Sequence, residues 1–203
     1  EFPDRTLLGE DVIWSGSPDI GMLSSHRLLS TATHSKDGVY GEATGKQLRY
    51  RILADCFAIN NQISDEWLVR DQGAIVRQMG WEPKTYAADL IAREGGPEAC
   101  IQPLTPHNDR PGPYQGKGND NAWGQDYAGI LTRIMGADMA VIPAAYDRAV
   151  QSELPGGKTG YGTGDLDAFW MGLRAAFPNA TFGIDHVMGR DDPLMPPRAA
   201  VRW

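Results

Sequence analysis

The stretch ISDEWLVRDQGAIVRQMG, residues 63–80, joins a predicted strand to a predicted helix. Glu66 and Trp67 are neighbours in the strand, so we expect their side chains on opposite faces of the sheet. Asp71 is placed to cap a helix, and Gly80 is placed to end it. The stretch therefore predicts a sheet strand followed at once by a short packing helix.

Further strands are predicted before this stretch. In the first of them, Leu8, Val12 and Trp14 occupy even positions with acids between them. Asn60 and Asn61 form a two-residue connection, and both residues tolerate the positive φ angles of a type I′ hairpin turn. The pattern thus predicts four strands, the last two joined by a tight hairpin: residues 5–14, 22–34, 48–59 and 62–70.

The rest of the chain alternates predicted helices with a linker. A helix beginning at Pro83 is stopped by Gly95-Gly96-Pro97. The run PLTPHNDRPGPYQGKGNDN lacks apolar periodicity and is rich in Pro, Gly, Asn and Asp. Amphipathic helices are predicted again after it, and a short strand precedes the loop PGGKTGYGTG. We therefore divide the chain into three parts: residues 1–100, a linker at 101–121, and residues 122–203.

Composition excludes several classes of protein. With 203 residues, 41% hydrophobic and 22% charged, the chain has the composition of an ordinary globular protein. A net charge of −7 disfavours a nucleic-acid partner, because phosphate binding needs a concentrated basic face. Cys56, Cys100 and the four scattered histidines show no metal-ligand spacing, so we expect no metal site. Since no apolar run could span a bilayer and EFPDRTLL does not read as a signal peptide, we expect a cytoplasmic protein without membrane partners.

The 63–80 stretch resembles the SnoaL-like polyketide cyclases and ester cyclases of the nuclear-transport-factor-2-like superfamily. The resemblance lies in an acid before Trp67, in Asp71 four residues after it, and in the closing RQMG. The segments HSKDGVYGEATGK and LRYRILADC, which precede it, are similar to the same family. This resemblance implies an α+β fold, in which a cone-shaped, curved antiparallel sheet wraps around helices as a cystatin-like α+β barrel. It also implies an apolar cavity for a small hydrophobic or polycyclic ligand, without a cofactor.

A weak internal repeat bears on how such a unit is arranged. Phe2-Pro3 and Thr6 recur with the same spacing as Phe177-Pro178 and Thr181. In the family's order of elements, residues 1–80 resemble the later part of one unit and the segment from 122 onward the early part of a second. The chain is then a circularly permuted cone, a domain-swapped assembly or homodimer, or a piece of a longer tandem protein.

The resemblance also suggests candidate catalytic residues. The family's cyclases use an acidic strand residue near this Trp as general acid and base in an intramolecular aldol closure, and the matching position here is Leu68. Glu66, on the same predicted face, is the nearest substitute, because an acid in an apolar cone would have a raised pKa. The family's pocket histidine corresponds to Ala54, beside the second candidate acid, Asp55. His26 is a candidate pocket donor.

Each candidate also has a purely structural interpretation. Glu66 is otherwise a solvated or salt-bridged acid, Asp55 is otherwise paired with an arginine such as Arg51, and His26 is otherwise bonded to the backbone. Two functions therefore stay open: a cofactor-independent cyclase or isomerase acting on a carbon acid, and a non-catalytic ligand-binding or assembly module. A third, water addition to an epoxide, needs an Asp-Arg-Asp network that the sequence does not supply.

Overall fold

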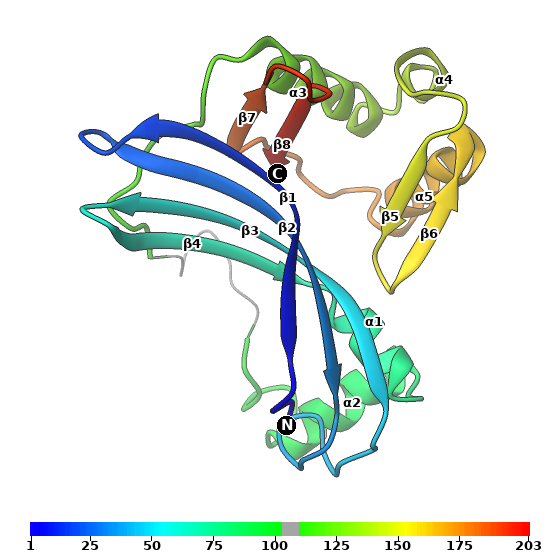
Figure 1. Ribbon diagram of the computed structural model, residues 1–203. Coiled ribbons are helices and arrows are strands. Elements are labelled where there is room, and N and C mark those ends of the chain that lie inside the picture. Colours follow the sequence, from blue (N-terminus) through cyan, green and yellow to red (C-terminus); the bar gives the residue numbers. More distant parts are fainter. Residues whose placement is uncertain (103–109) are drawn as a thin grey trace.

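Four long strands form the central sheet of the computed structural model, which describes residues 1–102 and 110–203 (Figure 1). Neighbouring strands are antiparallel and follow the order β1-β2-β3-β4. Asn60 and Asn61 have φ angles of 53° and 59°, which confirms the predicted type I′ turn between the last two strands. The strands run over these bounds: β1 (Thr6–Ser17), β2 (Gly21–Thr33), β3 (Gln47–Ile59) and β4 (Gln62–Arg70).

The remaining elements are helices and two small antiparallel sheets. Two helices follow the central sheet directly: α1 (Gln72–Gln78) and α2 (Pro83–Arg93). After them come three helices: α3 (Ala122–Met135), α4 (Val141–Ala145) and α5 (Gly162–Ala176). The two small sheets consist of β5 (Gln151–Leu154) with β6 (Lys158–Tyr161), and of β7 (His186–Arg190) with β8 (Arg198–Arg202).

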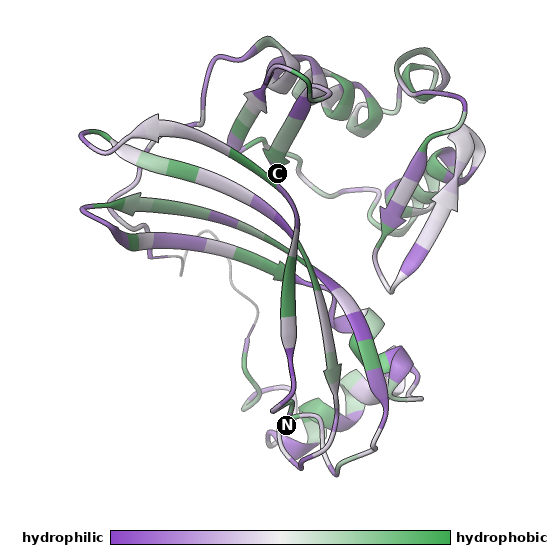
Figure 2. Ribbon diagram, viewed as in Figure 1, coloured by the Kyte–Doolittle hydropathy of each residue, from purple (hydrophilic) through white to green (hydrophobic). Residues whose placement is uncertain are grey.

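One hydrophobic core lies where α1 packs on the sheet. Buried and exposed residues alternate along this part of β3, and Figure 2 shows the same alternation as changes of colour along the lower strands. Asp71 accepts a hydrogen bond from Ala74 N–H at 2.9 Å, and Gly80 has a φ of 92°, so the predicted cap and stop of α1 are confirmed. The cluster is formed by apolar residues of β3 and α1: Leu48, Tyr50, Ile52, Ala74, Ile75 and Met79.

A second core holds residues 122–203 together beside the opposite face of the sheet. In Figure 1, α3 covers the β7–β8 pair, and α5 lies behind the β5–β6 hairpin. Leu131 and Ile134 of α3 meet Leu166 and Trp170 of α5 in this core. Only the first strand of this hairpin was predicted, because the PGGKTGYGTG sequence that follows it was interpreted as a loop. The two cores therefore lie on different faces of one sheet.

A β-bulge at Glu10 changes the phase of β1. The pairing with β2 shifts between Gly9 and Asp11, so that two residues of β1 face one residue of its partner. As a result Ile13 is buried, whereas Val12 is exposed. The even-position alternation predicted for this strand therefore does not continue through it, since a bulge reverses the inward and outward positions beyond it.

The α+β class with antiparallel sheets is confirmed. Within residues 1–102 and 110–203, β1 and β4 are edge strands that do not pair with each other, so the central sheet does not close into a barrel. The division at 101–121 stays a prediction, and the part of it at 103–109 lies outside the described residues. Among the helices of the described chain, none has both the length and the apolar character needed to cross a membrane.

The first core should be sensitive to loss of volume. Ile75 is 1% exposed, so Ile75→Ala should lower the free energy of unfolding by about 2–5 kcal/mol through lost burial and a residual cavity. Urea denaturation measures this change. Ile20→Ala is the control, because Ile20 is 74% exposed and its replacement should change stability by less than about 0.5 kcal/mol. Equal effects of the two substitutions would contradict the assignment of this core.

Candidate ligand-binding cleft

Two cavities lie between the central sheet and residues 122–203. Their volumes are about 710 Å³ and 470 Å³, within the range of roughly 300–1,000 Å³ that is common for small-molecule sites. Both are open to solvent on one side. They are adjacent, because four residues line both: Arg27, Leu53, Tyr127 and Trp170. We call the two together the cleft.

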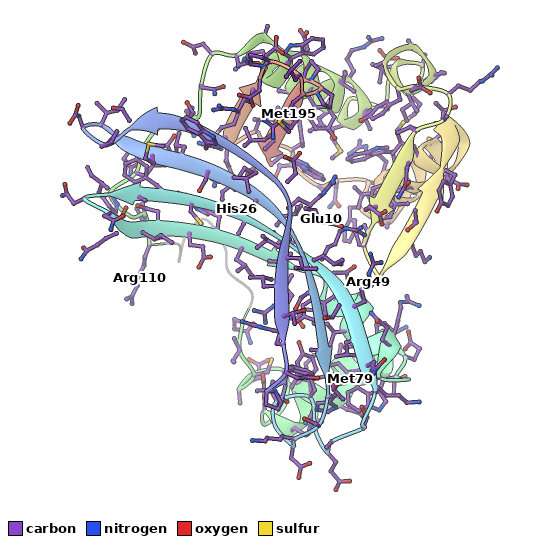
Figure 3. All side chains as sticks on the ribbon, in the orientation of Figure 1. Glu10, His26, Arg49, Met79, Arg110 and Met195 are labelled. Atoms are coloured by element: carbon purple, nitrogen blue, oxygen red, sulfur yellow. The ribbon has the colours of Figure 1, made fainter. Side chains whose placement is uncertain are left out.

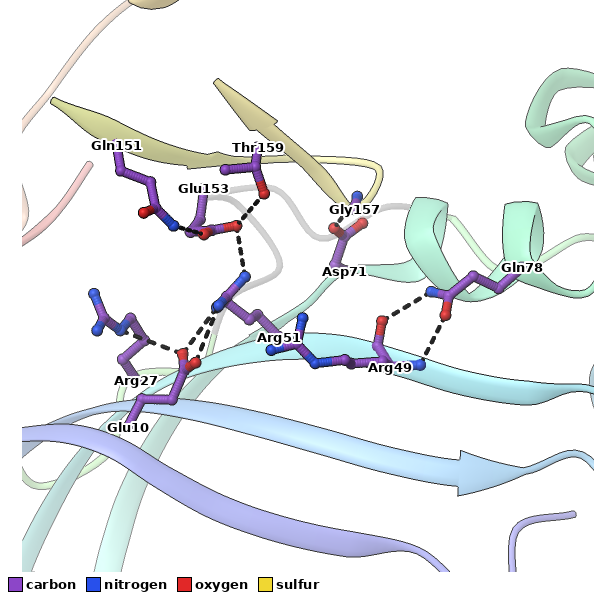
Figure 4. A network of polar contacts seen from close by, with 10 residues as sticks. All are labelled: Glu10, Arg27, Arg49, Arg51, Asp71, Gln78, Gln151, Glu153, Gly157 and Thr159. Carbon is purple, nitrogen blue, oxygen red and sulfur yellow. Dashed lines mark hydrogen bonds and ion pairs between the residues drawn. The ribbon is translucent and has the colours of Figure 1, made fainter. Parts of the chain in front are cut away.

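An ion-pair network crosses the larger cavity (Figure 4). Arg51 of β3 donates from Nε to Glu10 at 2.8 Å and from Nη1 to Glu153 of β5 at 2.6 Å. Arg27 lies 3.4 Å from the same Glu10 carboxylate. The hydrogen bond from Arg51 holds the pKa of Glu10 below its ordinary value. The network thus links the sheet to the β5–β6 hairpin.

The tip of that hairpin is attached to the start of α1. The Asp71 carboxylate, besides capping α1, accepts hydrogen bonds from Gly156 N–H at 3.0 Å and Gly157 N–H at 2.9 Å. Both glycines have positive φ angles, 82° and 71°, which favour glycine in this turn. One carboxylate therefore fixes both the helix and one end of the larger cavity.

The smaller cavity is built around Asp55. Its carboxylate accepts a hydrogen bond from Ser25 Oγ at 2.6 Å and pairs with Arg202 of β8 at 3.1 Å. The Arg202 guanidinium also lies 3.8 Å from the centre of the Trp67 ring, in a cation–π contact. Since Ser25, Asp55 and Trp67 point from neighbouring strands to one face, Arg202 joins β8 to β2, β3 and β4 together.

The half-buried Tyr114 and the buried His186 form a pair beside this site. Tyr114 Oη lies 2.9 Å from His186 Nε2 and accepts a hydrogen bond from Gly118 N–H at 3.1 Å. Burial lowers the pKa of His186, and the nearby Arg202 lowers it further. Burial also raises the pKa of Tyr114. The imidazole is thus neutral near pH 7, a state in which Nε2 is able to accept a hydrogen bond from the phenol.

The wall opposite the sheet is aromatic. Tyr127 comes from α3, Phe169 and Trp170 come from α5, and Tyr146 follows α4. Burial raises the pKa of Tyr146, so its phenol stays neutral. The indole Nε1–H of Trp170 is buried and has no hydrogen-bond partner in the part of the chain that the structure describes. A buried donor of this kind calls for an acceptor, and Trp170 lines both cavities.

Glu66 lies outside the cleft. Its register partner is Cys56, and Leu68 is opposite Ala54, so the predicted sharing of one face by Glu66 and Leu68 is confirmed. That face, however, is turned away from the cavities, and Glu66 is exposed. Trp67 lines the smaller cavity instead. The prediction that Glu66 faces the cavity is therefore wrong, because the covering layer lies on the other side of β4.

The structure does not bring the three predicted site residues together. Asp55 is in the cavity wall, but its partner is Arg202 and not the suggested Arg51. His26 is opposite Ala54, and its Nε2 is 2.8 Å from Ser24 Oγ, which places its side chain on the face away from Asp55. His26 therefore lines the smaller cavity, but its side chain does not point toward Asp55. Figure 3 labels it on the central sheet.

Sequence reasoning missed the residues of the helical wall and of β8. Arg202 contacts Asp55 across 147 positions, and Glu153 contacts Arg51 across 102, so no local pattern connects them. Within residues 1–102 and 110–203, no three His, Cys, Asp or Glu side chains are grouped so that they could hold a metal ion. A third, more open cavity beside α2 lies apart from the cleft and is lined by Tyr40, Trp81 and Tyr86 among others.

Comparison with known proteins adds little. No protein-family model matches the sequence, and no curated protein matches it. Among solved structures, the chain is similar to the crystal structure of AclR, a proposed hydroxylase from Streptomyces galilaeus, with 18% sequence identity and a TM-score of 0.35. The match covers 40% of this chain and 58% of that one. A similarity of this strength carries no argument about fold or function.

The buried His186 should make stability depend on pH. Because its pKa is lower in the folded state than in the unfolded state, the unfolded chain binds more protons below about pH 6.5. Folding is therefore weakened as the pH falls from 7.5 to 5.5. His186→Gln should remove part of that loss, measured by chemical denaturation at the two pH values. An unchanged pH dependence in the variant would contradict a depressed His186 pKa.

Proposed function

We propose that the protein binds a small, largely hydrophobic or polycyclic molecule in the cleft. The observation that carries this proposal is the pair of adjacent cavities, whose helical wall consists of the aromatic residues Tyr127, Phe169 and Trp170. Aromatic side chains offer large apolar surfaces to a ring system, and the sheet wall adds polar groups that would orient it.

Binding without chemical conversion is the function that the geometry favours. Glu66, the first candidate acid, is on the solvent side of β4. Asp55 is at the cavity, but one carboxylate oxygen accepts from Ser25 and the other pairs with Arg202. A general base must be within hydrogen-bond reach of the proton it removes, and these partners already occupy Asp55. We therefore prefer the ligand-binding module to the cyclase or isomerase.

The resemblance to the SnoaL-like family is also part of this proposal. Long antiparallel strands with helices on both faces agree with the α+β part of what the resemblance implies. We propose that the cone is completed by further chain, either a second copy or a continuation of the same protein, as the exposed apolar residues of both edge strands suggest. These residues include Leu7 and Leu8 of β1 and Leu68 and Val69 of β4.

Blocking the cleft should abolish binding. Leu53 lines both cavities and is 54% exposed, so Leu53→Trp adds bulk at the shared wall with little effect on the core. With anthracene methanol as a neutral probe, we expect the variant's dissociation constant to rise by at least ~10-fold. Fluorescence titration of the probe measures the change, and circular dichroism checks that the variant is folded.

A matched substitution separates blocking from a general effect of added tryptophan. Val39 is 69% exposed and lines none of the three cavities, so Val39→Trp should leave probe affinity unchanged. If the wild-type protein fails to bind the probe, or if both variants bind it as the wild type does, the cleft is not the ligand site.

A further inference from the structure

We infer that the ligand of the cleft carries an acidic group, a carboxylate on an aromatic ring system, and that Arg49 binds this group at the sheet wall of the larger cavity. The inference rests on the proposed function and adds the ligand's charge. It follows from the distribution of cations in the cavity, from the aromatic wall opposite them, and from the acidity of the rest of the chain.

The sheet wall of the larger cavity is rich in arginine. Arg49 and Arg51 are two positions apart on β3, so their side chains leave the same face of the sheet. Arg27 of β2 is opposite Leu53, which puts it on that face as well. All three line the larger cavity; a fourth lining arginine, Arg70, is opposite Ile52 and so leaves the other face of the sheet. Three guanidinium groups thus meet at one wall in a chain whose net charge is −7.

Most of this charge is neutralised within the protein, but Arg49 is not. Arg51 pairs with both Glu10 and Glu153, and Arg27 shares Glu10. The third nearby acid, Asp71, already accepts three backbone hydrogen bonds.

Arg49 itself forms no ion pair with any acid in residues 1–102 and 110–203. Within the described residues its hydrogen bonds come from its backbone, which bonds to the Gln78 side chain. In Figure 4 the dashed contacts of Arg49 are those with Gln78, and its side chain extends along the sheet. Figure 3 places Arg49 beside the tip of the β5–β6 hairpin. One guanidinium with its donors unused is therefore present at the cavity wall.

The opposite wall would accept the ring system. Phe169 and Trp170 lie at 5.3 Å between ring centroids and at 69° to each other, so they offer two differently inclined aromatic surfaces. Tyr127 and Tyr146 add two further rings to this wall. An occupant that meets both walls therefore has a carboxylate at one end and an aromatic body.

A carboxylate fits better than a polyanion such as a phosphate ester. The guanidinium fork forms two parallel hydrogen bonds with a carboxylate, which matches one group of charge −1 to the Arg49 guanidinium. A doubly charged group would meet the carboxylates of Glu10 and Glu153, both of which belong to the same network. Repulsion from these acids disfavours additional negative charge.

The test compares two fluorescent probes that share one ring system, anthracene carboxylate and anthracene methanol, in direct titration. We expect the wild-type protein to bind the carboxylate roughly 10-fold more tightly, as a charge-assisted hydrogen bond would give. This preference should shrink as sodium chloride is raised, because salt screens exposed charges. Arg49→Gln should remove the preference by weakening carboxylate binding roughly 10-fold.

Arg5→Gln is the matched control, because it removes the same charge from an exposed residue that lines none of the three cavities. It should keep the wild-type preference. If both probes bind equally in the wild type, or if Arg49→Gln keeps the preference, recognition of an anion by Arg49 is refuted while ligand binding stands. If neither probe binds, the proposed function fails and this inference fails with it.

Discussion

The arrangement of the whole chain depends on the β-bulge at Glu10. In a regular strand, neighbouring residues point to opposite faces, and Glu10 and Asp11 would be separated by the sheet. The bulge instead brings both acids to the face that meets residues 122–203. Glu10 there pairs with Arg51, and Asp11 pairs with Arg198 of β8 at 2.7 Å. One extra residue in one edge strand thus creates two points of attachment.

These attachments hold different parts of the second layer. Through Arg51 and Glu153, Glu10 is linked to the β5–β6 hairpin, which borders the larger cavity. Asp11 is linked through Arg198 to Asp192, and Arg190 of β7 lies 3.9 Å from the Trp14 ring centre. Such partly exposed ion pairs contribute little each, but several in one network fix the geometry between two layers. These ion pairs join the two layers around the cleft.

The sequence predicted the local features of the fold correctly, because each is specified by neighbouring residues. The turn at Asn60-Asn61 needs only two residues that tolerate positive φ, and the Asp71 cap needs only a backbone N–H three positions on. The shared face of Glu66 and Leu68 follows likewise from the period of a strand. The α+β class was predicted from the resemblance to the SnoaL-like family.

The site could not be predicted in the same way, because it is made by contacts distant in sequence. Which face of β4 meets the cleft is decided by where residues 122–203 lie, and no pattern within β4 carries that information. The bulge at Glu10 has no strong sequence signal either, so the phase of β1 beyond it was predicted wrongly. Arg202 and Trp170 belong to the site only through the packing of the second layer. Function without a cofactor stays a prediction. The homodimeric or domain-swapped assembly stays a prediction as well.

The most direct test of the account is hydrogen–deuterium exchange of the intact chain with and without saturating anthracene methanol. If the cleft between the two layers is the ligand site, the probe should slow exchange in both walls at once, in residues 49–55 of β3 and in residues 166–173 of α5. Slower exchange confined to α2, beside the third cavity, or to one wall alone would contradict a ligand held between the layers.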